Sequence, residues 1–435
     1  MKAFLKEFYS KNFKDKIVTY NFMEEQFLLE GYVSSNYVYK ILYKIRNFKI
    51  IKIVISYFFF FKRIKFIYNK PKKTDIIIFD CETKYDLECL LKYNNYQVLS
   101  TRTDSINQIY FCKEVFFPFI KNVFKFGLKN SYLISFIKVS SPKIVITNIM
   151  MSENFHIISN YFKNIINFII IQKGFIYEMS DKNKNNFFAK EIFVYGEYDK
   201  LWIEKNNLKV EKISVVGSLK SSLCNDFIKK NNINIQRNKY DICLISELHA
   251  QLNGDFDDVD GIADCIGQIA LFTIKLCKKF NLKLVFTGEG DGMNILSQRE
   301  ISFYKHYLKD HEFKIFQGPR RHYPSYRNVI ESNLTIGYVS TLLRESFSYK
   351  KKILSCDFLG SKRLTFPGTG IKLKEDSLFI LKGNSYEEFE KRVISLLKMS
   401  NKDYFNRLGS NVNFIMFPKT DTTKAIRKKI NNLLV

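Results

Sequence analysis

Short runs of aliphatic residues that end at a polar or glycine corner recur along the chain from residue 74 onward. "TDIIIFD" (74–80) is the first, and a stretch with helical spacing follows it. Such runs are typical of strands buried on both faces of a parallel sheet, because helices cover each face. The later runs are "YQVLST" (96–101), "PKIVITN" (142–148), "NFIIIQKG" (167–174), "AKEIFVYG" (189–196) and "VEKISVVG" (210–217). Strands that alternate with helices predict a doubly wound α/β sheet.

The same pattern restarts after the polar segment "KKNNINIQRNK" (229–239), which has no periodicity and is interpreted as a linker. The second set of runs is "YDICLIS" (240–246), "LKLVFTG" (282–288), "FKIFQG" (313–318), "LTIGYVS" (334–340), "KKILSCD" (351–357) and "SLFILKG" (377–383), and two helices are predicted after it. A chain of 435 residues is also too long for one ordinary core. We therefore predict two tandem Rossmann-like domains, 74–235 and 236–435, after a basic helical N-terminal segment, 1–73.

Net charge indicates an anionic partner. The chain has 69 Lys and Arg against 43 Asp and Glu, a formal charge of +26. Residues 48–68 mix Lys and Arg with Phe and Ile, which is typical of a helix on an anionic membrane surface; a core helix with solvated lysines is the alternative. The uninterrupted apolar part, 53–61, is shorter than the roughly 20 residues that span a bilayer. The N-terminus lacks a signal-peptide pattern, so we expect a cytoplasmic protein, peripheral on the inner face of the membrane.

The eight cysteines are scattered and form no C-x-x-C pair. We interpret them as buried, reduced thiols, and we expect neither a zinc site nor disulfides. No D-x-D motif follows a strand, so no metal site is predicted.

The corner "VSTLLRE" (339–345) is the strongest candidate ligand site. Free backbone N–H groups at a helix start bind anions, and the hydroxyls of Ser340 and Thr341 add donors there. Glu345 lies one turn further on the same side, where a carboxylate accepts hydrogen bonds from a ribose diol. The alternative is an N-cap Thr followed by an ordinary helix Glu.

A loop rich in cations and aromatic residues precedes this corner. Arg321, His322 and Tyr326 lie in "GPRRHYPSYR" (318–327), and such residues suit a base-and-phosphate pocket. Gly217 and Ser218 end a strand of the first domain and are expected to face the same cleft, with a helix cap as the alternative. These residues complete the predicted donor-binding set.

Two residues are candidates for the chemistry itself. Glu153 follows the strand "KIVIT" and is the candidate general base, and Lys173 in the Gln-Lys-Gly corner is the candidate partner of a phosphate or carboxylate. His156 lies in an apolar helical phase, so we interpret it as a core histidine.

Together these segments resemble a family of bacterial surface-carbohydrate biosynthesis proteins, glycosyltransferases of the two-Rossmann (GT-B) type. The resemblance rests on "KIVITN", "ENFHIIS", "FIIIQKGF", "FVYGEYDKLW", "VVGSLKSS", "YPSYRNVIESNLTIGYVSTLLRES" and "LLKMSNKDYF". It implies metal-independent transfer of a sugar from a nucleotide-sugar donor to a capsule, lipopolysaccharide or lipid-linked glycan acceptor. The nucleotide-sugar is then a substrate, and no cofactor is expected. A CMP-linked keto-sugar acid is one candidate donor, because the "GPRRHY" cations suit a sugar carboxylate.

Other functions stay open at this point. A glycerol- or alditol-phosphate transferase of the teichoic-acid polymerase type has two similar domains, although Lys173 stands where a histidine is usual. A nucleotide-sugar 2-epimerase shares the fold and differs in acting on the donor alone. A non-catalytic membrane or nucleic-acid binder fits the charge, but the sequence carries no nucleic-acid module motif, so no nucleic-acid partner is expected.

Overall fold

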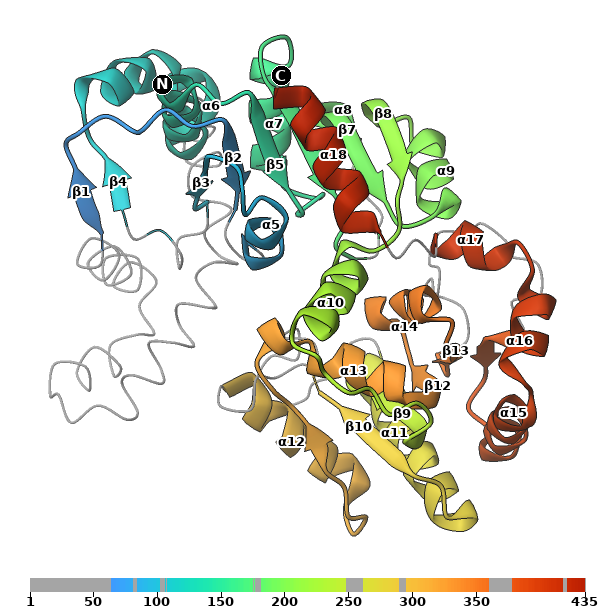
Figure 1. The fold of residues 1–435 in the computed structure, drawn as a ribbon. Helices are drawn as coiled ribbons and strands as arrows, with labels where there is room; N and C mark the ends of the chain where they lie inside the picture. Colours follow the sequence, from blue (N-terminus) through green and yellow to red (C-terminus); the bar gives the residue numbers. More distant parts are fainter. Residues whose placement is uncertain are drawn as a thin grey trace, which may run out of the picture. The chain divides into compact units, whose positions relative to one another are not determined.

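A computed structural model describes residues 64–80, 84–101, 106, 108–174, 176, 181–247, 261–288, 295–359, 378–417 and 421–434. Two parallel six-stranded sheets carry helices between successive strands (Figure 1). By packing, the chain divides into two compact units. The described residues of unit 1 fall within Met1–Ile170, Asn185–Glu191 and Asn431–Val435, and those of unit 2 within Ile171–Lys184 and Ile192–Ile430.

The first sheet has the strand order β3-β2-β5-β6-β7-β8. Its strands are β2 (Ile76–Phe79), β3 (Tyr96–Leu99), β5 (Ile144–Thr147), β6 (Asn167–Ile171), β7 (Phe188–Val194) and β8 (Lys209–Val215). In β2 all four side chains are buried, and Ile76 lies opposite Tyr96 of β3 and Ile144 of β5 in parallel register. The continuous apolar runs of the sequence are thus strands covered on both faces, as predicted.

Helices follow these strands, as the alternation of strands and helices predicts. They are α5 (Lys84–Leu90), α7 (Glu153–Phe162), α8 (Asp181–Asn186), α9 (Glu197–Lys205) and α10 (Leu219–Lys230). Ser152 caps α7 and Ser218 caps α10, because each side chain accepts a backbone N–H of the first turn. His156 of α7 is buried, as predicted for a core histidine; its Nε2 lies 2.7 Å from the Met150 carbonyl oxygen.

Two features near the N-terminal end of the described chain differ from the prediction. Within the segment predicted to be helical, residues 65–67 form a strand, β1 (Lys65–Ile67), parallel to β4 (Gln108–Tyr110). Ile67 pairs with Tyr110, so tertiary pairing determines the conformation of this piece. Residues 1–63 lie outside the described residues, and they include positions 48–63 of the predicted membrane-surface stretch 48–68. The long helix α6 (Lys113–Ser140) was not predicted; it contains Pro118 and a non-helical residue, Gly127.

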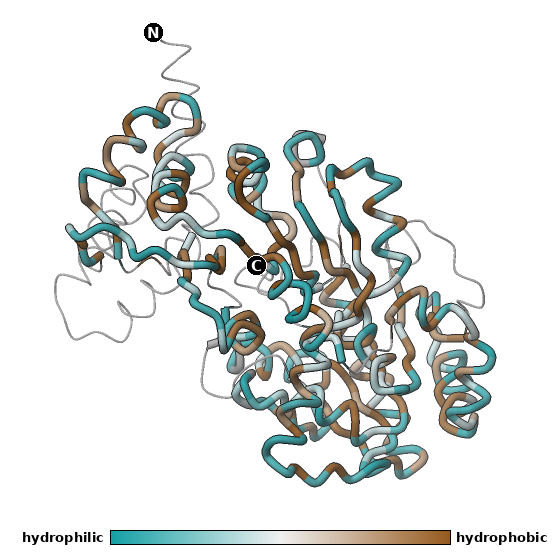
Figure 2. The backbone as a smooth tube through the Cα atoms, turned by 45° about the horizontal axis from the view of Figure 1, so that its top comes forward, coloured by the Kyte–Doolittle hydropathy of each residue, from teal (hydrophilic) through white to brown (hydrophobic). Residues whose placement is uncertain are grey.

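The second sheet has the order β11-β10-β9-β12-β13-β14. Its strands are β9 (Tyr240–Ile245), β10 (Leu284–Thr287), β11 (Ile315–Phe316), β12 (Ser332–Gly337), β13 (Lys352–Asp357) and β14 (Ile380–Lys382). The central strands β9, β12 and β13 are buried along most of their length, and Figure 2 shows brown, hydrophobic stretches of backbone in the interior of the fold. Every strand of this sheet was predicted from the sequence.

Helices α11 (Ile262–Phe280), α12 (Ile295–Leu308), α13 (Pro324–Glu331) and α14 (Thr341–Ser346) connect the strands, with the short turns η1 (Arg320–His322) and η2 (Phe347–Tyr349). Four helices follow β14, where two were predicted: α15 (Tyr386–Lys398), α16 (Asn401–Leu408), α17 (Asn411–Ile415) and α18 (Thr422–Leu434). The Thr422 hydroxyl donates to the Val216 carbonyl, and Thr423 bonds to Ser222. The last helix therefore begins against residues that directly follow the first sheet.

Across the described residues, no helix has the length and hydrophobicity needed to cross a bilayer. Six of the seven cysteines in this part of the chain are buried, which confirms their predicted burial, and Cys89 is half-buried.

Candidate functional site

Three strand ends of the first sheet and the start of α14 meet inside unit 2. Gln172 and Gly174 follow β6, Tyr195 follows β7, and Ser218 follows β8. A Cβ atom on Gly174 would lie 3.4 Å from Oγ1 of Thr341, so this corner is in contact range of the α14 start. Because ligands of open α/β sheets bind beyond the carboxyl ends of strands, this meeting point is the candidate site.

The start of α14 is organised by Ser340. The backbone of Ser340 is extended, and its Oγ accepts a hydrogen bond from the Leu342 N–H at 3.2 Å. Ser340 is therefore the N-cap, and Thr341 is the first helical residue. Both side chains are half-buried, whereas the helix behind them is buried throughout.

The carboxylate of Glu345 is surrounded by hydroxyl donors. Its Oε1 accepts from Ser218, in a short contact, and from the Tyr195 hydroxyl at 3.4 Å, while Oε2 accepts from the Tyr326 hydroxyl at 2.5 Å. Glu345 itself is 1% exposed. Burial, and then the nearby Glu345 charge, raise the pKa of Tyr195 and Tyr326 well above the usual value, so both phenols keep the protons that they donate.

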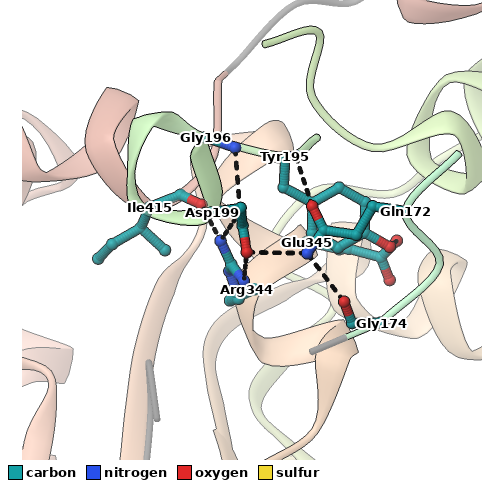
Figure 3. Close-up of polar contacts among 8 residues, drawn as sticks. All are labelled: Gln172, Gly174, Tyr195, Gly196, Asp199, Arg344, Glu345 and Ile415. Carbon is teal, nitrogen blue, oxygen red and sulfur yellow. Dashed lines mark hydrogen bonds and ion pairs between the residues drawn. The ribbon is translucent and has the colours of Figure 1, made fainter. Parts of the chain in front are cut away.

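An ion pair next to Glu345 links α14 to α9 (Figure 3). The Arg344 guanidinium donates to both carboxylate oxygens of Asp199, with Nη1–Oδ1 and Nη2–Oδ2 distances of 3.0 and 2.5 Å. Nη2 also donates to the Ile415 carbonyl oxygen at 2.6 Å, and the guanidinium lies over the ring of Tyr195, 5.4 Å from its centroid. Both charged side chains are 0% exposed. The pair therefore fixes the orientation of α14 within this unit.

Gln172 extends this network to the strand ends. Its Oε1 accepts the Tyr195 N–H at 2.8 Å, and its Nε2 donates to Asp199 Oδ1 at 2.8 Å and to the Gly174 carbonyl at 2.9 Å. Figure 3 shows these bonds meeting at the Gln172 amide, with one of them leading to the Asp199 carboxylate. The amide thus holds the corner that carries Lys173 in one conformation, and Lys173 itself is half-buried.

Sequence reasoning missed Gln172, Tyr195, Asp199 and Arg344 as members of this site. One signal was available, because Asp199 lies three residues after Gly196 at a helix start, and its carboxylate accepts the Gly196 N–H at 3.2 Å. A second was Arg344, a cation directly before the candidate residue Glu345 in the helix. Neither signal names the partner, because Arg344 and Asp199 are 145 positions apart in sequence.

The three residues predicted for donor binding in the loop 318–327 lie in different environments. Tyr326 reaches Glu345, as described above, whereas Arg321 and His322 are exposed. The His322 ring stacks on Phe227 of α10, with ring centroids 5.7 Å apart and planes 18° from parallel. This stacking places η1 against α10; donor binding by Arg321 and His322 stays a prediction.

Ser218 is the helix cap that was weighed as the alternative, while donor binding by Gly217 and Ser218 stays a prediction. Gly217 has φ +85°, and a Cβ there would lie 2.4 Å from the Phe417 carbonyl oxygen, so glycine is required by backbone conformation and by contact. Ser218 Oγ accepts the Ser221 N–H at 3.1 Å as the cap of α10, and its hydroxyl also donates to Glu345. The helix cap and the contact with the Glu345 carboxylate thus come from the same hydroxyl.

Glu153 is the first residue of α7 and belongs to unit 1, where its side chain is half-buried. Lys173 belongs to unit 2. The catalytic roles of both stay predictions. Among the described residues, no group of three or more His, Cys, Asp or Glu side chains has the arrangement of a metal site.

No protein-family model matches the chain, and neither does any curated protein. Solved structures do resemble it. S. aureus MnaA in a co-structure with UDP superimposes with a TM-score of 0.50 at 12% identity, covering 84% of this chain and 98% of MnaA. UDP-GlcNAc 2-epimerase from Neisseria meningitidis, bound to UDP-GlcNAc, gives 0.48 at 12% identity with 82% and 99% covered. The wall teichoic acid polymerase TagF gives 0.49 at 11% identity with 83% and 90% covered. At such low identity the likeness to MnaA concerns the fold, and it confirms the predicted pair of parallel-sheet domains.

Proposed function

We propose that this protein is a glycosyltransferase that uses a nucleotide-sugar donor to extend a bacterial surface glycan. The observation that carries the proposal is the meeting of the Gly174 corner with Thr341, one turn before the carboxylate of Glu345. That arrangement offers a hydroxyl for a phosphate and a carboxylate for a ribose at the carboxyl ends of parallel strands. The UDP in the MnaA co-structure supports a nucleoside diphosphate as the first ligand to test.

In the proposed complex the ribose hydroxyls replace one of the present donors to Glu345. The Tyr195 hydroxyl is the candidate, because its 3.4 Å contact is longer than the contacts of Ser218 and Tyr326 with the same carboxylate. A ribose hydroxyl at this oxygen would restore the lost hydrogen bond, so the carboxylate would remain satisfied. Arg344 keeps its place on Asp199 and acts as a positioning residue for α14.

Transfer breaks the bond between the anomeric carbon of the sugar and the phosphate oxygen, and the nucleotide leaves with the electron pair. Lys173 is the proposed cation for the negative charge that develops on the phosphate. Glu153 is the proposed base that takes the proton of the acceptor hydroxyl as the new glycosidic bond forms. The acceptor is proposed to be a capsule, lipopolysaccharide or other lipid-linked glycan.

The test combines a ligand screen with a turnover assay. Thermal unfolding of the full chain is followed with UDP, CDP, GDP and CMP in turn, and stabilisation by one nucleotide identifies the donor class. The matching nucleotide-sugars, a CMP-linked keto-sugar acid included, are then incubated with and without membrane glycan from a bacterial surface. Nucleotide release that requires the glycan supports a transferase. Turnover of the free nucleotide-sugar without an acceptor, or no binding of any nucleotide, contradicts the proposal.

A further inference from the structure

Exposed apolar side chains gather in one part of unit 1, at the end of β4 and along the first half of α6. We call six of them the aromatic face: Phe111, Phe116, Phe117, Ile120, Phe124 and Leu128. Phe117 is 70% exposed and Phe124 is 69% exposed, although a phenylalanine on a solvated helix face is unfavourable. A contiguous exposed apolar patch marks an interaction surface, whereas single scattered apolar residues on a surface do not.

The rings at the start of the aromatic face lie close together. Phe111 and Phe116 have ring centroids 5.5 Å apart, and Phe116 and Phe117 have centroids 6.3 Å apart. Phe66 of β1 adds to this group, 6.5 Å from Phe111. Positions 117, 120 and 124 of α6 follow one another at helical spacing, so their side chains share one side of the helix, and Leu128 follows the non-helical Gly127. Val115 and Val123, on the other side, are buried.

Lysines interrupt the same exposed face of α6. Lys113, Lys121, Lys125 and Lys129 are all exposed, and Glu114 is the acidic residue among them. A helix face that mixes exposed phenylalanines with lysines is typical of helices that lie in a membrane interface, with rings below the headgroups and ammonium groups beside anionic lipid. Lysine stems are also long enough to reach the headgroups while the rings are inserted.

Charge argues against the other occupants of this face. A second copy of the chain in a two-fold interface would bring the lysines of both copies together, which is repulsive. An anionic lipid surface complements the charge of these lysines.

We propose that the aromatic face and its lysines dock this protein on a bilayer that contains anionic phospholipid. The surface lies at the end of β4 and on α6, and the proposal does not depend on the reaction that the protein catalyses.

The experiment is flotation of the full chain with vesicles of phosphatidylcholine alone and of phosphatidylcholine with phosphatidylglycerol. The wild type is expected to float with the anionic vesicles and to lose binding in high salt. Phe117→Ser/Phe124→Ser is expected to weaken binding about tenfold or more, because two rings no longer insert. The matched control is Tyr93→Ser/Ile165→Ser, which removes two apolar side chains that are 80% and 79% exposed in turns of unit 1.

Charge is tested with Lys121→Gln/Lys125→Gln against the exposed pair Lys229→Gln/Lys230→Gln of α10, and only the first pair is expected to reduce binding to anionic vesicles. Circular dichroism checks that each variant is folded. Binding by the phenylalanine variant equal to that of the wild type overturns the proposal, because another part of the chain then carries the membrane contact. The proposal is also overturned, in favour of self-association, if the wild type does not bind vesicles but forms a dimer that the phenylalanine variant does not form.

Discussion

The guanidinium of Arg344 and the carboxylate of Asp199 form a two-point ion pair from which solvent is excluded, although the two residues are 145 positions apart. The pair connects the helix that carries Thr341 and Glu345 to the helix after β7. Charges in such an environment are stabilising only while both are present, because each one alone would be buried without compensation.

Removal of one partner of this pair should therefore destabilise unit 2 strongly. Arg344→Met is expected to lower the free energy of unfolding by about 3–5 kcal/mol. Asp199→Asn should have an effect of the same direction, and the double variant should lose less than the sum of the two single variants. Chemical denaturation of the four proteins measures the coupling. Additive losses would show that the pair does not act as a unit.

Glycine at position 217 should be required for a steric as well as a conformational reason. Gly217 and Gly383 have φ values of +85° and +93°, but only Gly217 has a backbone atom, the Phe417 carbonyl oxygen, within 2.4 Å of the Cβ that alanine would add. Gly383→Ala is expected to reduce stability by about 1–2 kcal/mol from left-handed backbone alone. Gly217→Ala should reduce it by clearly more. Equal losses in thermal unfolding would argue against the close contact with Phe417.

The stability of the protein should decrease as the pH falls below 6.5, partly through His156. Burial lowers the pKa of His156 to about 4, whereas the unfolded chain has the usual value of about 6.5. Between these values the unfolded state binds a proton that the folded state does not bind, so acid favours unfolding.

At about pH 5 this difference corresponds to a loss of about 2 kcal/mol relative to neutral pH. Denaturation at both pH values should show that His156→Gln loses less stability between neutral pH and about pH 5 than the wild type does, by about 2 kcal/mol. The exposed His322 provides the control variant His322→Gln. A pH dependence of His156→Gln identical to that of the wild type would contradict the buried neutral state of His156.

Strand positions could be predicted from the sequence because local composition determines them. Ile76–Phe79 is buried on both faces, and so is Lys352–Asp357, where the Lys352 ammonium donates to the Leu396 and Met399 carbonyls. The strand β1 could not be predicted, since Lys65–Ile67 is a strand only through its pairing with Gln108–Tyr110. Short pieces of this kind depend on tertiary partners rather than on their own pattern.

One part of the candidate site, the corner at residues 339–345, was predictable because its own sequence carries a local signal. Ser340 caps α14, and Glu345 lies one turn on, as the spacing indicates. The three hydroxyls that meet Glu345 come from Tyr195, Ser218 and Tyr326, which lie 150, 127 and 19 positions away. No local sequence pattern predicts contacts between segments that are so far apart. The buried network around the Glu345 carboxylate could therefore be identified only from the structure.

The central claim is that a nucleotide binds at the start of α14 with its ribose on Glu345, and isothermal titration of Glu345→Gln tests it most directly. The matched control is Glu300→Gln. Glu300 is also 1% exposed and also accepts a serine hydroxyl, that of Ser246, in the same unit. Both variants should lose similar stability, but only Glu345→Gln should weaken binding of the nucleotide selected by thermal shift, by about tenfold, the equivalent of one charged hydrogen bond. Equal nucleotide affinity of the wild type and Glu345→Gln would contradict the account.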